Sequence, residues 1–283
     1  MDGIAPMQRE RIADDIIVFV SDRYVQVTAT VVMTSDGAVL FDTLLYPEET
    51  RQIKRYVETR LGSVVRFVIN SHFHADHSTG TCFFPEAQVI AHMRCRDLLD
   101  KRGRVGLARA KASTDEMRDV EIVLPDIAFG DEGMILQVGN KTLELTPATG
   151  HSPDSIICLV REDRTLLGAD TVMSLPYFVD GSYDELYRSL ERLLGENYEH
   201  VVQGHGDVIL RGEIEEKLRG DLRYLQRMHD AVADAMTSRS REAALAAIEI
   251  EACGKSRILL NGSAEALHRK NVLALASHHI AEP

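Results

Sequence analysis

The sequence contains few cysteines, and those that it has stand far apart. None belongs to a Cys-x-x-Cys pair, and the four are Cys82, Cys95, Cys158 and Cys253. Disulfide frameworks and zinc–thiolate sites are built from closely spaced cysteines, so the sequence favours neither. We therefore expect reduced, structural thiols.

An excess of positive charge and long apolar runs are also missing. Lys and Arg number 32 against 44 Asp and Glu, which gives a formal net charge of -12. Nucleic acids and anionic membrane surfaces are bound by clustered cations, so neither kind of partner is expected. No apolar run approaches the length of a membrane span, and residues 1–10 lack the apolar core of a signal peptide. These absences predict a cytoplasmic protein.

The remaining composition is ordinary for a soluble globular protein, with 45% hydrophobic and 27% charged residues. A chain of 283 residues can hold one large α/β domain with additions. From Gly212 onward, apolar residues keep helical spacing and charges fill the other faces. We therefore predict a catalytic domain over residues 1–210 and a C-terminal helical extension over residues 211–283, packed on the same domain.

One short segment, His72-Phe73-His74-Ala75-Asp76-His77, dominates the sequence. It follows the apolar run 64–69, whose length and β-branched residues predict a buried strand. The segment should therefore lie on a loop at the end of that strand, where a rigid scaffold presents chemical groups. A lone histidine is usually a surface or core residue, but this density of imidazole and carboxylate groups indicates a metal site.

Three further candidate ligands also follow predicted strands. His151 comes after the predicted hairpin 134–146, Asp170 follows the run 165–169, and His205 follows Val201-Val202. Asp42 occupies a similar place after the run 38–41. Strand ends in an α/β sheet meet at a common edge, so these side chains are candidates for one site.

Helical patterns surround these strands. Helices are expected at 47–61, 92–101, 183–194, 243–250 and 264–276. The stretch Gly103–Arg118 has no strong apolar face, and a solvated helix is favoured there over a mobile lid. His268, His278 and His279 are expected at the surface. The C-terminal helices are expected to cover one face of the domain, cap the substrate or support a homodimer.

These motifs resemble those of the metallo-β-lactamase superfamily, most closely its glyoxalase II-like and lactonase-like branch. The resemblance runs from about Ile16 to about Gly206. It rests on Leu40-Phe41-Asp42-Thr43, on the His72–His77 segment, on Thr149-Gly150-His151, on Gly168-Ala169-Asp170 and on Gly204-His205-Gly206. The resemblance implies an α/β (α+β) fold, a four-layer αββα sandwich of two mixed sheets flanked by helices, here with the C-terminal helical extension.

The resemblance also implies a role for each candidate residue. His72, His74 and His151 would hold a first divalent ion, Asp76, His77 and His205 a second, and Asp170 would bridge the two. The ions would be zinc, with manganese or iron as alternatives. Asp76 is the candidate catalytic group, because it would pass a proton to the leaving group. Asp42 would steady the ligand loops, and the alternative is that it caps the turn before the helix at Pro47.

The implied reaction is hydrolysis of an ester, thioester, lactone or amide bond in a small molecule by a metal-bridging hydroxide. The alternative is a mononuclear-iron oxidoreductase like the persulfide dioxygenases, in which His72, His151 and Asp170 would hold the iron. A β-lactamase is less expected, because the common metallo-β-lactamases have Cys in place of Asp170 or lack the bridging carboxylate. Tyr177 and Phe178 are candidates for substrate contact, with core packing as the alternative.

Overall fold

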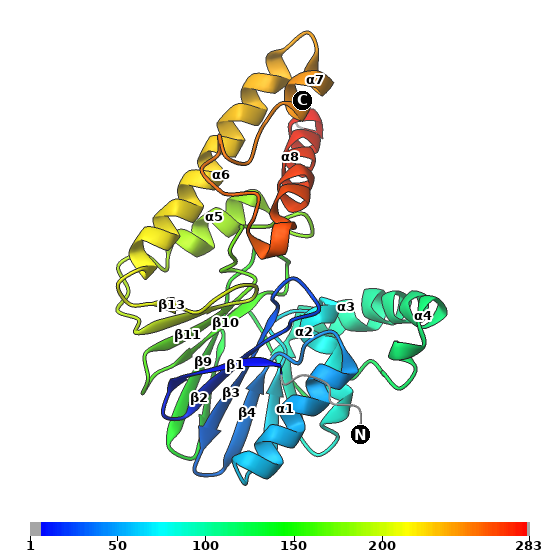
Figure 1. Cartoon of the computed structure of the whole chain (residues 1–283), viewed down its shortest axis with the longest axis vertical. Coiled ribbons are helices and arrows are strands. Elements are labelled where there is room, and N and C mark those ends of the chain that lie inside the picture. The colour runs from blue at the N-terminus through cyan, green and yellow to red at the C-terminus, as the bar shows by residue number, and fades with distance from the viewer. Residues whose placement is uncertain (1–6, 282–283) are drawn as a thin grey trace.

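The computed structural model describes residues 7–281, and it describes side chains as far as Ser277. Residues 1–6, which carry part of the signal-peptide expectation, and the side chains of His278 and His279 lie outside this part of the chain. Two β-sheets stack face to face with helices on their outer faces (Figure 1). Both sheets are mixed, so the predicted αββα sandwich is confirmed.

The first sheet contains seven strands in chain order. They are β1 (Gln8–Ala13), β2 (Ile16–Val20), β3 (Thr28–Thr34), β4 (Gly37–Phe41), β5 (Val65–Ile69), β6 (Gln88–His92) and β7 (Ile127–Phe129). Strands β1 to β4 pair antiparallel, and β4 to β7 pair parallel. The sequence did not predict β1, because this strand is mostly exposed and has no apolar alternation.

The second sheet has the strand order β13-β12-β11-β10-β9-β8. Its strands are β8 (Met134–Val138), β9 (Lys141–Pro147), β10 (Ile156–Val160), β11 (Thr165–Ala169), β12 (His200–Gln203) and β13 (Ile209–Leu210). Only β11 and β12 pair parallel. The predicted hairpin corresponds to β8 and β9, which turn at Gly139 with its positive φ.

The helices follow from capping and apolar spacing. Their bounds are α1 (Pro47–Arg60), α2 (Ala75–Ser78), α3 (Met93–Leu98), α4 (Arg104–Ser113), α5 (Tyr183–Glu191), α6 (Ile214–Thr237), α7 (Arg241–Ala246) and α8 (Ala264–Ala281). Short 3-10 turns cover Thr79–Phe83, Asp115–Met117 and Leu260–Gly262, and a π-helical turn, Leu99–Gly103, joins α3 to α4. None of the helices in the described part of the chain has the length and apolar character of a membrane span.

Three apolar clusters account for the layers. Between the sheets, inward residues such as Val18 and Val39 of the first sheet pack with Leu143 and Leu167 of the second. Helix α1 covers the outer face of the first sheet, and α5 and α6 cover the second. Burial of each side chain of this kind contributes roughly 1.5–3 kcal/mol, which is why period-two apolar strands assemble in this order.

The C-terminal helices pack against α5 and the second sheet in one continuous apolar cluster, and they extend beyond the sandwich (Figure 1). His268 on α8 is buried, so its predicted place at the surface is wrong. Its Nδ1 lies 3.0 Å from the Tyr224 hydroxyl, and its Nε2 lies 3.1 Å from the carbonyl oxygen of Ile248. His268 is instead a hydrogen-bonded core residue, because α8 turns it toward α6.

A buried ion triad stabilises the same helices. The Asp221 side chain on α6 accepts hydrogen bonds from Lys217 Nζ at 2.5 Å and Lys255 Nζ at 2.6 Å. We expect Asp221→Asn to lower the free energy of unfolding by about 3–5 kcal/mol, because two largely buried ammonium groups would lose their counter-charge. Urea denaturation measures this change. Asp234→Asn, at an exposed position on the same helix, should change it by less than about 0.5 kcal/mol.

Candidate metal centre

The predicted ligands all leave the carboxyl ends of strands at one edge of the two sheets. His72, His74 and α2 follow β5, and Asp42 follows β4. From the second sheet, His151 follows β9, Asp170 follows β11 and His205 follows β12. Apolar packing between the two sheets therefore brings together segments that lie far apart in the sequence.

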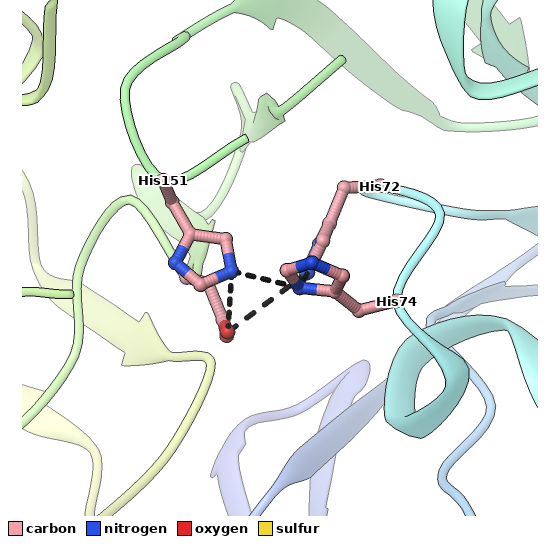
Figure 2. A group of neighbouring side chains, drawn as sticks. His72, His74 and His151 are labelled. Carbon is pink, nitrogen blue, oxygen red and sulfur yellow. Dashed lines mark hydrogen bonds and ion pairs between the residues drawn. The ribbon is translucent and has the colours of Figure 1, made fainter. Parts of the chain in front are cut away.

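The first group of candidate ligands consists of His72, His74, His151 and Asp170. Each offers one side-chain N or O atom, and these atoms all lie within 4.8 Å of one another. His74 Nδ1 lies 2.9 Å from His72 Nε2 and 3.0 Å from His151 Nε2. Asp170 Oδ2 lies 3.2 Å from His151 Nε2. Figure 2 shows these three imidazole rings pointing toward one another.

The second group consists of Asp76, His77 and His205. Asp76 Oδ2 lies 3.2 Å from His205 Nε2 and 3.6 Å from His77 Nε2. Asp170 lies between the two groups, with Oδ1 at 3.2 Å from His77 Nε2 and Oδ2 at 3.4 Å from His205 Nε2. One carboxylate therefore reaches ring nitrogens of both groups.

Each of the five rings is oriented by a bond to its outer nitrogen. The outer N–H groups of His151 and His205 donate to the carbonyl oxygens of Tyr177 at 2.8 Å and Val25 at 2.9 Å. A carbonyl oxygen can only accept, so in the neutral ring the inner nitrogen carries the lone pair. His77 and His74 make the same kind of bond to carboxylates.

His72 reaches the same state through a serine. The Ser71 hydroxyl donates to Asp42 Oδ2 at 2.7 Å, so this hydroxyl must accept the 2.9 Å hydrogen bond from His72 Nδ1. All five inner nitrogens therefore face one space that also holds two carboxylates. Outer bonds of this kind orient histidines that bind metals.

The convergence of these acceptors fits divalent cations. His77 Nε2 and Asp170 Oδ1 are buried and have no aligned hydrogen-bond partner within the described part of the chain. Buried polar atoms without a partner are rare and costly, and a bound ion would satisfy both. Nitrogen and oxygen donors without thiolate suit zinc, manganese or iron.

The two groups differ in how they hold protons. Burial, reinforced by neighbouring histidines, lowers the pKa of His72 well below its ordinary value, and burial lowers the pKa of His151 to about 4. Burial acts the same way on His77 and His205, but the carboxylates of Asp170 and Asp76 outweigh it. They raise the pKa of His77 well above its ordinary range and that of His205 to about 10.

Two backbone features allow Asp170 to reach both groups. Ala169 has a φ of 43°, in the left-handed region that residues other than glycine rarely adopt. A Cβ at Gly204 would lie 1.9 Å from Asp170 Oδ1, so only glycine fits there. Strained backbone of this kind is found at functional sites, where the surrounding structure enforces it.

Asp42 lies behind the ligand loops. Its carboxylate accepts hydrogen bonds from the Ser71 backbone N–H at 2.8 Å, from the Ser71 hydroxyl and from His77 Nδ1–H at 2.8 Å. Helix α1 begins after Tyr46 without a side-chain cap, so the alternative that Asp42 caps this turn is not observed.

We expect Asp42→Asn to weaken metal binding by about 10- to 100-fold, since an amide cannot accept all three of these bonds. Competition with a chelating dye measures this affinity. Asp36→Asn, in the exposed turn between β3 and β4, is the matched control. Equal affinity in both variants would remove Asp42 from the metal centre.

Several contact residues had no signal in the sequence. Asp180 accepts the 2.9 Å hydrogen bond from His74 Nε2–H, and Arg102 in turn donates to Asp180. Asp154 is buried and accepts hydrogen bonds from the Phe73 backbone N–H and the Ser152 hydroxyl, both at 2.7 Å, so it joins two ligand loops. Isolated acids are common, and only the tertiary contacts distinguish these two.

The two predicted substrate contacts, Tyr177 and Phe178, differ in their surroundings. Phe178 is buried in the apolar core beside Tyr183, in the packing role that was its alternative. The Tyr177 carbonyl orients His151. Asn271 of α8 accepts from the Phe178 backbone N–H at 3.3 Å and donates to the Pro176 carbonyl at 2.8 Å. The C-terminal extension therefore supports the loop that orients His151.

Comparison with known proteins agrees with this geometry. The family model of the metallo-beta-lactamase superfamily matches residues 22–230. The chain is 28% identical over 190 residues to a metallo-beta-lactamase type 2 of Bacillus cereus, a match that covers 64% of this chain and 68% of that protein. It is 24% identical over 147 residues to a beta-lactamase-like protein 2 homolog of Caenorhabditis elegans, covering 52% of this chain and 44% of the relative.

Solved structures share the fold. A metallo-beta-lactamase from Pontibacter korlensis has a TM-score of 0.65 at 20% identity and covers 78% of this chain and 99% of its own. The stereoselective inverting sec-alkylsulfatase Pisa1 from Pseudomonas sp. has a TM-score of 0.76 at 14% identity. That match covers 98% of this chain and 51% of the sulfatase chain, so it includes most of the C-terminal helices. From the family match, the fold and the histidine–aspartate cluster together, the chain belongs to the metallo-β-lactamase superfamily of metal-dependent hydrolases.

Proposed function

We propose that this protein is a dinuclear hydrolase that cleaves an ester, thioester, lactone or amide bond of a small molecule. The observation that supports two ions is the position of Asp170, whose two oxygens lie 3.2 Å from His151 of one group and 3.2 Å from His77 of the other. Divalent ions bound there, zinc first and manganese or iron as alternatives, would supply an activated water and polarise the scissile carbonyl.

The side chains of this centre are held in fixed orientations by the chain itself, and they supply its charge. His72, His74 and His151 would bind one ion, and Asp76, His77 and His205 the other. The outer hydrogen bonds fix all five rings before a substrate arrives, so little reorganisation is needed during the reaction. No Ser-His-Asp arrangement is needed for a nucleophile.

Asp76 is the candidate for proton transfer. Its side chain is 14% exposed against 4% for Asp170, so it is the carboxylate nearer the mouth of the centre. Burial raises its pKa, but His77 and His205 outweigh burial and lower it to about 2, so it is ionised at neutral pH. An ionised, accessible carboxylate can accept a proton from water and pass it to the leaving group.

Other functions have less support. A single iron on His72, His151 and Asp170, as in the persulfide dioxygenases, leaves the second group without a role, although its atoms converge as closely as those of the first. The Bacillus cereus relative is named a metallo-beta-lactamase, but Asp170 stands where the common metallo-β-lactamases have cysteine or lack the bridging carboxylate. The glyoxalase II-like and lactonase-like branch stays a prediction.

Metal content and a substrate panel test this function. Protein loaded separately with zinc, manganese and iron is analysed for bound metal, and then assayed on esters, thioesters, lactones, amides, a β-lactam, a phosphoester and an alkyl sulfate. About two ions per chain with turnover of a carbonyl substrate is the expected result. One iron with oxygen consumption would establish the alternative, and failure to bind any of the metals would overturn both.

Uptake of the second ion should depend on pH more steeply than uptake of the first. At neutral pH His72 and His151 are neutral rings with a lone pair available to an ion, whereas His77 and His205, with raised pKa values, are cationic and must each release one proton. The association constant of the second ion should therefore rise between pH 6 and pH 9, by up to about tenfold per pH unit for each proton released. Zinc titration at several pH values measures both constants, and parallel slopes would contradict the assignment.

A further inference from the structure

A cavity of about 450 Å³ lies beside the metal centre. Its walls come from the His72–His77 loop, the π-helical turn Leu99–Gly103, α4 and the turn at Met117. Most wall residues are apolar, among them Phe73, Leu99, Val105, Leu107, Met117 and Ile122. Cavities of this size and character are typical of small-molecule sites.

The cavity and the metal centre share one wall. His74 lines the cavity, and its Nδ1 atom on the other side of the same ring lies 2.9 Å from His72 Nε2. Asp180, which accepts the hydrogen bond from His74 Nε2–H, also lines the cavity. A molecule in the cavity is therefore about one imidazole ring away from the metal-facing atoms of the first group.

The segment that forms the outer wall is cationic, although the chain has a net charge of -12. Between residues 101 and 111 it carries Lys101, Arg102, Arg104, Arg109 and Lys111 without an acidic residue. Three of these, Lys101, Arg102 and Arg109, line the cavity. Arg102 pairs with Asp180, but no described acidic side chain pairs with Lys101 or Arg109. The cavity therefore combines an apolar interior with unneutralised positive charge at its rim.

Helix α4 is placed to contact a ligand rather than the core. None of the residues Arg104–Ser113 is buried. Val105 lines the cavity and is 49% exposed. Contact between an exposed apolar side chain and an apolar ligand buries apolar surface of both, which makes binding more favourable. The π-helical turn that precedes α4 is of a kind found frequently at functional sites.

We propose that this cavity binds the acyl part of the substrate, and that the substrate is an apolar chain ending in an anionic group such as a carboxylate. The proposal rests on the proposed hydrolase function. The scissile carbonyl lies at the metal centre, the chain fills the space between Phe73 and Val105, and the anion meets Lys101 and Arg109. Volume, apolar walls and charge together favour this occupant over a polar metabolite.

A series of p-nitrophenyl esters from acetate to decanoate tests the apolar part with metal-loaded enzyme. We expect kcat/KM to rise about three- to fourfold per methylene until the cavity is full. Gly106 lines the cavity, and a Cβ there meets nothing within 4 Å, so Gly106→Leu fits the helix and fills part of the cavity. This variant should lose at least about tenfold in kcat/KM on decanoate and little on acetate. Ala112→Leu, at an exposed position of α4, is the control.

The monoester of octanedioic acid, compared with the octanoate ester, tests the anionic part. Wild-type enzyme should have the higher kcat/KM on the carboxylated ester. Arg109→Glu should shift the ratio of the two kcat/KM values by about tenfold or more, so that the neutral ester is preferred. This shift should be smaller at high salt. Lys111→Glu makes the same charge change outside this cavity and should keep the wild-type preference. An equal effect of both variants, or a preference for the neutral ester, would overturn the anionic group.

Failure of this proposal can be distinguished from failure of the hydrolase function. Suppose that metal-dependent turnover shows no chain-length preference and that Gly106→Leu and Ala112→Leu have equal kcat/KM values. This result would contradict the acyl-binding role of the cavity, but it would still support the hydrolase function. If no ester is turned over, calorimetric titration with hexanoate and decanoate decides. Tighter binding of decanoate, lost in Gly106→Leu, supports the cavity, and equal binding of the two acids overturns it.

Discussion

His74→Ala should abolish turnover and leave the protein folded. Its Nδ1 atom lies 2.9 Å from His72 Nε2 and 3.0 Å from His151 Nε2, so its loss opens one side of the first group of ligands. Loss of an outer partner of a metal-binding histidine alone costs 10- to 100-fold in activity or affinity, so removal of a ligand should cost more than about 100-fold in kcat/KM. The side chain is 20% exposed and lies outside the apolar clusters, so the core should be unaffected.

Steady-state kinetics, metal analysis and circular dichroism measure these effects together. The control is His200→Ala, because His200 begins β12 at the end opposite His205 and has a partner at 3.5 Å in Thr165. That variant should keep both its metal and its activity. Full activity of His74→Ala on the true substrate would remove the hydrolytic mechanism.

Asp170→Asn should have the larger effect, because this carboxylate contacts both groups. The amide has nearly the same shape but no charge, so it would no longer offset the positive charge of His77 and His205. We expect no more than about one ion per chain and a fall in kcat/KM of more than about 1000-fold, since several kcal/mol of charge stabilisation disappear with the second ion. Asp207→Asn, an exposed acid two residues after His205, is the control.

The metal-free form of the same variant gives an independent result. The pKa of His205 is raised to about 10, and among the groups that raise it the Asp170 carboxylate has the largest effect. Its replacement should therefore lower that pKa, which a histidine-resolved NMR titration of metal-free protein would detect. A pKa unchanged by Asp170→Asn would mean that the carboxylate lies elsewhere in solution.

Local sequence pattern was sufficient to predict the strands that carry the ligands. Apolar runs such as 64–69 and 165–169 end in histidine or aspartate, and alternation with a period of two is a property of the segment itself. For this reason the gathering of seven candidate ligand residues at one edge could be predicted before any coordinates, whereas the αββα fold class was implied by the resemblance of these motifs to the metallo-β-lactamase superfamily. The charged edge strand β1 was not predicted, since its pairing with β2 depends on backbone bonds rather than on apolar residues.

Contacts between distant segments could not be predicted in this way. The Val25 carbonyl orients His205 across 180 residues of sequence, and Asp180 orients His74 across 106. Every residue has a carbonyl, and isolated acids occur throughout the chain, so neither partner differs in sequence from its neighbours. The stretch after Gly103 forms a solvated helix, which the sequence favoured, but the cavity behind it could not be predicted. The walls of that cavity come from the separate stretches 73–79, 99–110 and 117–122 together with Leu45 and Asp180.

The sequence by itself indicated which residues are candidate ligands and which strands carry them, because strand periodicity and loop position are local properties. The tertiary structure alone decided which nitrogen of each histidine faces inward, that Asp170 reaches both groups, that His268 is buried, and that an apolar cavity adjoins His74. Those features depend on packing between remote segments, which places atoms within about 3 Å of one another only after the two sheets have closed over their shared core.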